Sequence, residues 1–163
     1  MTSPPTSSIQ QHRAAPKPSH QEMYETDFAE WINEAAALMK QGKFSELALE
    51  NLIDEVATLG SSEKNALRSN LCVLLIHLLK WQYQPSKRTN SWKATIREHR
   101  NRIQETFEDS PSLKNYYEQV FNKSYSKAQA LAADETGLDI DSFPAKSPYS
   151  LQQVLDHEFL PKE

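Results

Sequence analysis

The sequence predicts an all-α protein, a compact bundle of about five to six helices that follows a disordered N-terminal tail. Two observations support this fold class. Only three glycines occur in 163 residues, whereas residues that favour helix, such as Leu, Ala, Glu, Lys and Gln, dominate the composition. Apolar side chains also recur at helical spacing along most of the chain. A chain of this length can bury one helical core without support from disulfides or metals.

The chain is expected to consist of a tail, residues 1–22, and a single helical domain, residues 23–163. The tail is rich in Ser, Thr, Gln and His and has almost no apolar side chain that could join a core, which predicts disorder. Its four prolines are Pro4, Pro5, Pro16 and Pro18.

The first helix is predicted over residues 27–41, because Asp27 is placed to cap its start and Gly42 to end it. The core stripe of this helix comprises Phe28, Trp31, Ile32, Ala35, Leu38 and Met39. After a turn, a second helix is predicted over residues 49–59, and Gly60 is expected to end or bend it. Its apolar face comprises Leu49, Leu52, Ile53, Val56 and Leu59.

The third helix, predicted over residues 63–83, is apolar nearly all round, which places it at the centre of the domain. It contains Cys72, the only cysteine, so no intramolecular disulfide can form and a buried, inert thiol is expected. Its uninterrupted apolar run, residues 71–76, is far shorter than the ~20 residues that span a bilayer, and the N-terminus lacks the apolar stretch of a signal peptide. We therefore expect a cytoplasmic protein without membrane association.

Proline and glycine residues divide the remaining sequence into further helices. Pro85 forces a break, and a fourth helix starts near Ser91. A long fifth helix follows, with Ser110 as its N-cap and Pro111 at its first position, and Gly137 ends it. A last short helix begins with the capping-box pair Ser150 and Gln153.

Five separated phrases of the sequence match one known family in the right order. They are YETDF at 24–28, ENLIDE at 50–55, HLLKWQ at 77–82, SWKATIR at 91–97 and DSPSL at 109–113. Over about residues 24–161, the chain thus resembles domain-of-unknown-function family 29, a bacterial group well represented in cyanobacteria. The resemblance implies an all-helical bacterial protein of unknown activity, and it carries no catalytic residue, ligand or cofactor across to this sequence.

Charge is distributed unevenly along the chain. The net charge of −4 and the pI near 5.8 argue against bulk nucleic-acid binding. Residues 22–63 hold ten carboxylates against two lysines, a balance of −8, whereas residues 80–104 hold seven basic residues against one glutamate, a balance of +6. The acidic and the basic segment are therefore candidate contact surfaces of opposite sign.

The candidate binding surface is a basic and aromatic patch in the second of these segments. Its cations Lys93, Arg97 and Arg100 are spaced to align along one side of the fourth helix. Cations interleaved with aromatic rings can hold single-stranded nucleic acid. Alternatively, the cations pair with the acidic helices within the molecule. The full patch comprises Lys80, Trp81, Lys87, Arg88, Trp92, Lys93, Arg97 and Arg100.

The only catalytic candidates are two carboxylates and a histidine. Glu50 and Asp54 lie four residues apart on one face of the second helix, and with His77 they could serve in metal-assisted or acid–base chemistry. The favoured interpretation is that the carboxylates are solvated or in salt bridges and that the histidine is a satisfied core residue. No metal ion and no cofactor are predicted.

No catalytic motif is recognised, and the three glycines stand too far apart to form a phosphate-binding loop. We therefore predict a small cytoplasmic, non-catalytic interaction or regulatory module that binds another protein. The alternatives are a nucleic-acid-binding protein or an enzyme acting on nucleic acid, either of which would use the basic patch. The oligomeric state is left open.

Overall fold

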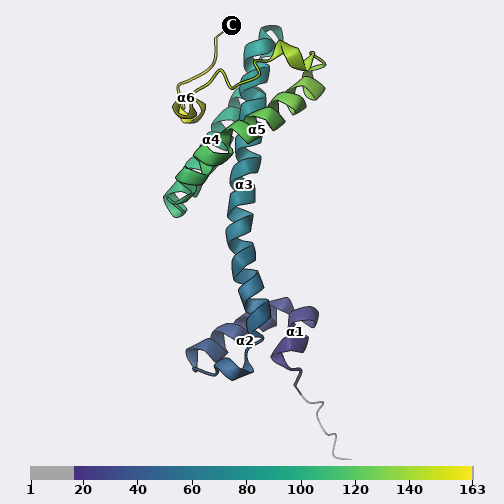
Figure 1. The fold of residues 1–163 in the computed structure, drawn as a ribbon, viewed down its shortest axis with the longest axis vertical. Helices are drawn as coiled ribbons and strands as arrows, with labels where there is room; N and C mark the ends of the chain where they lie inside the picture. The colour runs from purple at the N-terminus through teal and green to yellow at the C-terminus, as the bar shows by residue number, and fades with distance from the viewer. Residues whose placement is uncertain (1–16, 163) are drawn as a thin grey trace, which may run out of the picture. The chain divides into compact units, whose positions relative to one another are not determined.

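A computed structural model describes residues 17–162 of the protein (Figure 1). In the described residues, six α-helices and three short 3₁₀ helices are joined by turns, without any β-strand, so the all-α prediction is confirmed. The chain divides into two compact units, Met1–Val56 and Ala57–Glu163. Residues 1–16 of the predicted tail lie outside the described residues. The prediction that residues 23–163 behave as a single domain stays a prediction.

The first unit consists of α1 (His20–Thr26), α2 (Phe28–Lys40), the 3₁₀ helix η1 (Phe44–Glu46) and the first turns of α3 (Leu49–Tyr83). The sequence-based prediction contains no helix corresponding to α1, which begins within the range assigned to the tail. A capping box starts it: the Ser19 hydroxyl accepts from the N–H of Glu22, and the Glu22 carboxylate accepts from the N–H of Ser19. This local signal outweighs the proline-rich composition before it.

The core of the first unit is built around Trp31, which is fully buried. The ring of His20 stacks on it with 5.3 Å between ring centres. The N–H of Ala48 donates to Nδ1 of His20 over 2.9 Å, so the proton of the neutral imidazole lies on Nε2, which donates to the carbonyl of Trp31 over 3.1 Å. His20 therefore ties α1, α2 and the start of α3 together.

The two helices predicted over residues 49–59 and 63–83 are one continuous helix, α3, so the expected end or bend at Gly60 is wrong. Gly60 lies in the helical interior, where a Cβ would meet no atom within 4 Å. One glycine costs a helix only about 1 kcal/mol relative to alanine, which is too little to end it. Gly42 and Gly137, by contrast, have φ of +72° and end α2 and α5 as predicted.

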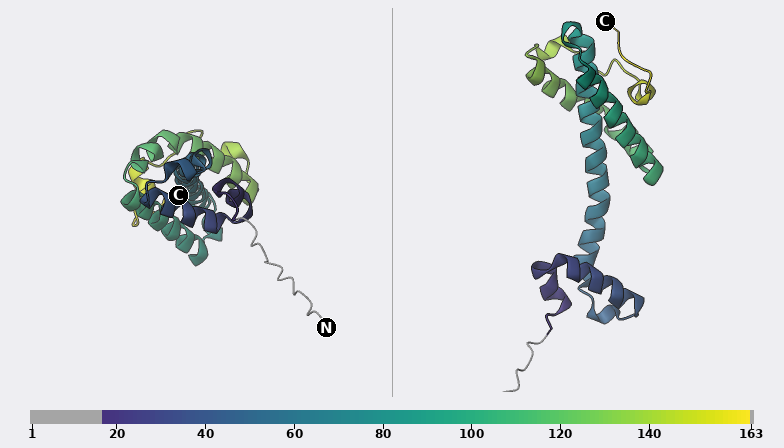
Figure 2. Two further views of the ribbon diagram at one scale, coloured as in Figure 1. Left: turned by 90° about the horizontal axis from the view of Figure 1, so that it is seen from below. Right: turned by 180° about the vertical axis from the view of Figure 1, so that it is seen from behind.

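The second unit packs α4 (Asn90–Asp109) and α5 (Leu113–Thr136) against the C-terminal part of α3 (Figures 1 and 2). The prediction that the segment 63–83 lies at the centre is confirmed. The α3 side chains that are fully buried, at 0% exposure, are Leu67, Leu71, Leu74, Leu75, Leu78 and Leu79. They pack on Ile96 and Ile103 of α4 and on Tyr125 and Ala128 of α5.

The segment after α5 folds back onto the second unit and contains η3 (Ile140–Ser142) and α6 (Leu151–Leu155). The capping box that begins α6 is confirmed, since Ser150 and Gln153 exchange hydrogen bonds. The predicted start of α5 is wrong by two residues, because residues Ser110 to Leu113 form a turn in which the Leu113 N–H donates to the Ser110 carbonyl over 2.9 Å. The helix begins where that turn ends.

Candidate functional site

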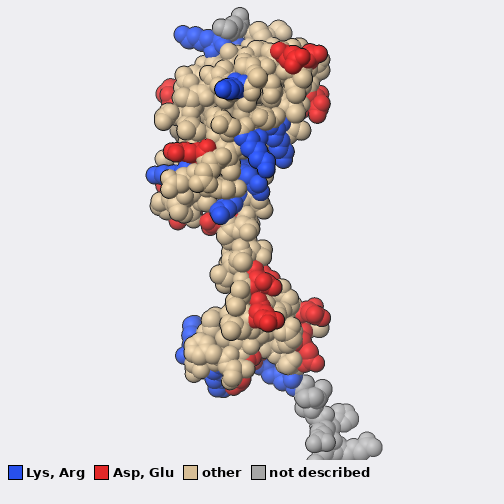
Figure 3. Space-filling view, viewed as in Figure 1, with Lys and Arg blue, Asp and Glu red and all other residues tan. Residues whose placement is uncertain are grey.

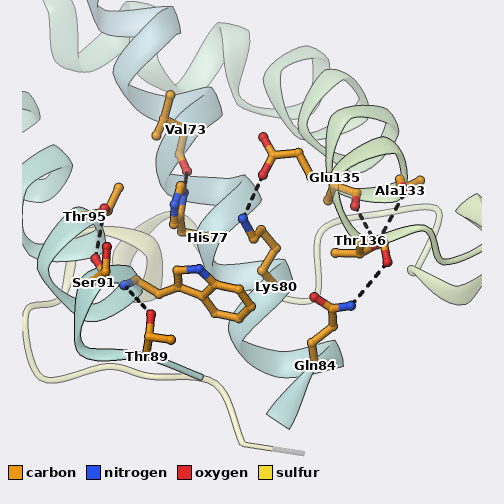
Figure 4. A network of polar contacts seen from close by, with 12 residues as sticks. Val73, His77, Lys80, Gln84, Thr89, Ser91, Thr95, Ala133, Glu135 and Thr136 are labelled. Carbon is orange, nitrogen blue, oxygen red and sulfur yellow. Dashed lines mark hydrogen bonds and ion pairs between the residues drawn. The ribbon is translucent and has the colours of Figure 1, made fainter. Parts of the chain in front are cut away.

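Part of the predicted basic and aromatic patch is engaged in internal packing. Nζ of Lys80 lies 2.8 Å from a carboxylate oxygen of Glu135 (Figure 4) and 4.8 Å from the centre of the Trp92 ring. The lysine therefore joins α3 to α5 through the ion pair and to α4 through the ring. The side chain of Lys80 is only 14% exposed, so this cation is an interhelical contact rather than a surface charge.

Arg88 is paired with the second tryptophan of the patch. Its Nε donates to the carbonyl of Trp81 over 2.7 Å, and its guanidinium lies 5.2 Å from the centre of the Trp81 ring. Each of the two tryptophans thus holds one of the protein's own cations against its ring. Base stacking on those ring faces would require these contacts to break.

The predicted basic stripe is wrong at Arg100, which does not share an exposed face with Lys93 and Arg97. It is 2% exposed. Its guanidinium donates to the carbonyl of Val154 over 2.8 Å and to that of Phe159 over 2.9 Å, with a longer contact of 3.4 Å to Gln153. Burial lowers the pKa of Arg100. Its function is to hold the C-terminal segment, since carbonyl groups of that segment surround the charge.

Three cations of the patch remain exposed: Lys87, Lys93 and Arg97. Lys93 and Arg97 lie one turn apart on α4, as their spacing predicts. None of the three forms an ion pair with another described residue. The exposed basic surface of α4 is therefore smaller than the sequence indicates.

The catalytic candidates belong to different units. Glu50 and Asp54 are exposed residues of the first unit. His77 is half-buried in the second, where its Nδ1 donates to the carbonyl of Val73 over 2.9 Å (Figure 4), and burial lowers its pKa. Among residues 17–162, no group of three or more His, Cys, Asp or Glu side chains is arranged to hold a metal ion.

The feature that stands out is the number of large apolar side chains that the first unit exposes. Of the ten large apolar side chains that are exposed in the described chain, seven belong to this unit. We call them the apolar face: Phe28, Ile32, Met39, Phe44, Leu49, Ile53 and Val56. Among residues 17–56, the same unit buries only four apolar side chains, namely Met23, Trp31, Ala35 and Leu38. Exposed apolar patches on soluble proteins often mark contact sites, so these side chains are a candidate contact site.

Two predicted core stripes therefore need correction. In the stripe of residues 27–41, Trp31, Ala35 and Leu38 are buried, but the other three side chains are exposed. In the stripe of residues 49–59, only Leu52 is even half-buried. Helical spacing shows which side chains share a face, but it cannot show whether that face is covered by the same chain. The first unit has too few helices to cover both stripes.

The surroundings of the apolar face are acidic. Residues 17–56 contain nine carboxylates against three lysines, a net charge of −6. Figure 3 shows Asp and Glu side chains on the surface of this unit. On α3, Glu50 and Asp54 are exposed in the same turns as Leu49 and Ile53. Glu55 instead accepts a hydrogen bond from the Tyr24 hydroxyl over 2.8 Å, which fastens α3 to α1.

The fold and these surfaces define an all-helical protein whose first unit exposes many large apolar side chains. The chain belongs to the family described as "Domain of unknown function DUF29", whose model matches residues 23–160, and this confirms the resemblance seen in the sequence. Comparison with curated proteins gives no match, and comparison with solved structures gives none. In residues 17–162, no helix has both the length and the apolar character that crossing a membrane requires.

Proposed function

We propose that this protein is a non-catalytic interaction module of the cytoplasm that binds a helical segment of another protein on the apolar face of the first unit. The observation that supports this function best is the imbalance within that unit, which exposes seven large apolar side chains and buries four apolar ones. Burying a Leu, Ile or Phe side chain contributes about 1.5–3 kcal/mol, so covering even part of the face would stabilise a complex substantially.

The shape of the face suits a helical partner. Leu49, Ile53 and Val56 follow one another at intervals of four and three residues, so they form one stripe along α3. A second stripe on α2 contains Phe28, Ile32 and Met39, also at helical spacing. Stripes of this kind receive amphipathic helices that present apolar anchors at the same intervals.

The negative charge of the first unit favours a partner helix with basic residues beside its apolar stripe. With a net charge of −6 around the apolar face, a partner helix with Lys or Arg beside its apolar stripe gains electrostatic attraction. A second copy of the same face would bring two acidic surfaces together, which is unfavourable. We therefore assign the face to a basic amphipathic helix rather than to self-association.

The test uses two synthetic helical peptides with the same apolar stripe, one flanked by lysines and the other by glutamates. Isothermal titration calorimetry on the full chain should show binding of the lysine peptide, with affinity that falls as salt rises, and at least tenfold weaker binding of the glutamate peptide. Ile53→Glu and Val56→Glu should each weaken binding of the lysine peptide at least tenfold. Both side chains are more than half exposed, at 58% and 61%, so these variants should fold.

Ile140→Glu is the matched control, because Ile140 is an exposed apolar residue of the second unit, and this variant should bind the peptide like the wild type. Equal affinity for the two peptides, or equal loss in Ile140→Glu and Ile53→Glu, would refute the assignment. So would sedimentation equilibrium that shows a dimer of the wild type and a monomer of Ile53→Glu, because a second copy would then cover the face.

A further inference from the structure

A basic pocket lies in the second unit and shares no residue with the apolar face. Its volume is about 330 Å³. It is lined from α3 by Arg68, Ser69 and Cys72 and from α5 by Lys123, Ser124 and Lys127. Figure 3 shows Lys and Arg side chains gathered on the surface where α3 and α5 run beside each other. The sequence pattern does not reveal this pocket, because its cations come from two helices far apart in the chain.

The lining of the pocket is positively charged. Three cations contribute to it, and its lining contains no carboxylate. Within the described part of the chain, Arg68, Lys123 and Lys127 form no ion pair. The guanidinium of Arg68 donates a hydrogen bond to the side-chain oxygen of Asn65, a neutral acceptor. Cations that line one cavity repel one another, and an anion in the cavity would relieve that repulsion.

Two hydroxyl groups of the lining are also left available. Elsewhere on these helices, the hydroxyls of Ser61 and Ser126 donate to the carbonyl four residues earlier, each over 3.2 Å. Ser69 and Ser124 have no such hydrogen bond to any described residue, although Ser124 is only 6% exposed. Both residues line the pocket, so their hydroxyls can donate to a ligand oxygen there.

We propose that this pocket binds the phosphate group of a small anion. The Arg68 guanidinium can donate two parallel hydrogen bonds to phosphate oxygens, and the lysine ammonium groups add positive charge and further donors. The hydroxyls of Ser69 and Ser124 can donate to the remaining oxygens. The volume of about 330 Å³ is at the small end of ligand pockets, which fits a free phosphate or a small organic phosphate.

The single thiol of the chain provides a reporter inside the pocket. Cys72 lines it and is 7% exposed. Burial raises the pKa of this thiol, while the charge of Lys127 acts in the opposite direction. A bound phosphate would block access to the sulfur and neutralise the lysine. Alkylation of Cys72 by a neutral reagent should therefore become slower when the pocket is filled.

The experiment titrates the ¹⁵N-labelled full chain with sodium pyrophosphate, inorganic phosphate and glycerol phosphate, each at constant ionic strength set with sodium chloride. Saturable shifts confined to amides around residues 65–72 and 120–127, together with slower alkylation of Cys72, would support the site. Arg68→Ala and Lys127→Ala should weaken binding at least tenfold. Circular dichroism would verify that the variants keep their helices, as expected for two exposed side chains.

Lys114→Ala is the matched control, because Lys114 is an exposed lysine of the same helix that does not line the pocket. It should bind like the wild type. Tighter binding of glycerol phosphate than of the inorganic anions would identify an organic phosphate as the ligand, and the reverse order would identify a free phosphate. Amide shifts that do not saturate would overturn the proposal. So would phosphate binding that weakens as much in Lys114→Ala as in Lys127→Ala.

Discussion

Removal of the Arg100 side chain should destabilise the second unit and release the C-terminal segment. Arg100 lies on α4 and is almost fully buried, and its guanidinium donates to carbonyls of Val154 and Phe159. In Arg100→Ala these carbonyls lose a charged donor and stay shielded from water. The segment is also held by the buried side chain of Val154 and by the hydroxyl of Tyr117, which donates to the carbonyl of Leu151 over 3.0 Å, so its release should be partial.

The expected loss of unfolding free energy follows from the two short hydrogen bonds of Arg100, to the carbonyls of Val154 and Phe159. A hydrogen bond to a charged group contributes about 1.5–3 kcal/mol, so two contribute about 3–6 kcal/mol before the desolvation of the guanidinium is subtracted. We expect Arg100→Ala to lower the free energy of unfolding by about 3 kcal/mol. Arg100→Lys should recover part of this loss, because a lysine can supply a charge but not the planar fork that serves both carbonyls.

The assay is urea unfolding followed by circular dichroism, combined with hydrogen exchange of the amides in residues 150–161. Arg97→Ala is the control, because Arg97 is an exposed arginine one turn earlier, and it should change the free energy of unfolding by less than about 0.5 kcal/mol. If the two variants have the same free energy of unfolding and the same amide exchange rates in residues 150–161, Arg100 does not hold the C-terminal segment and our interpretation of its burial is wrong.

Three further predictions test other contacts. Lys80→Ala should lower the free energy of unfolding by about 1–2 kcal/mol, because it loses the Glu135 ion pair and the Trp92 ring, whereas Lys93→Ala should leave the urea midpoint nearly unchanged. Gly60→Ala should raise the thermal midpoint through about 0.5–1 kcal/mol of helix stabilisation, because its helical backbone has room for a Cβ, and a lower midpoint would contradict a continuous α3. Burial raises the pKa of Tyr125 from its ordinary value of 10 to about 12, so the unfolded chain loses this proton first. Its contribution to stability should be complete below about pH 10 and disappear as the pH rises to about 12, and unfolding measured across that range should be less pH-dependent in Tyr125→Phe.

Local signals predicted much of the secondary structure. The side chain of Asp27 accepts from the N–H of Glu30 over 3.1 Å at the start of α2, and Gly137 adopts the left-handed conformation at the end of α5. These features depend on residues three or four positions apart, so the sequence alone contains what is needed to predict them. The helix break that the sequence predicts at Gly60 is absent, because a solvated glycine in a helix costs only a small free energy relative to alanine.

The candidate sites depend on contacts that local patterns do not contain. The spacing of Arg100 placed it on the basic stripe, but its burial depends on a segment more than fifty residues later that folds over it. In the same way, the cations of the pocket come from α3 and α5, and only the pairing of these helices brings Arg68 near Lys123 and Lys127. The sequence shows that Lys123 and Lys127 lie four residues apart on one helix, but it does not show that they share a cavity with Arg68.

The exposed apolar face also affects how the first unit is stabilised. Because only Met23, Trp31, Ala35 and Leu38 form its apolar core, this unit gains little from hydrophobic burial and should open more easily than the second. A partner that binds only the folded face would stabilise it by about 2.7 kcal/mol when present at a hundred times its dissociation constant. Amide exchange in α1 and α2 should then slow when the lysine peptide binds, while the amides around Leu75 and Ile103 stay unchanged. On the proposed function, binding would be coupled to ordering of the first unit, because the partner would cover the apolar side chains that the unit leaves exposed.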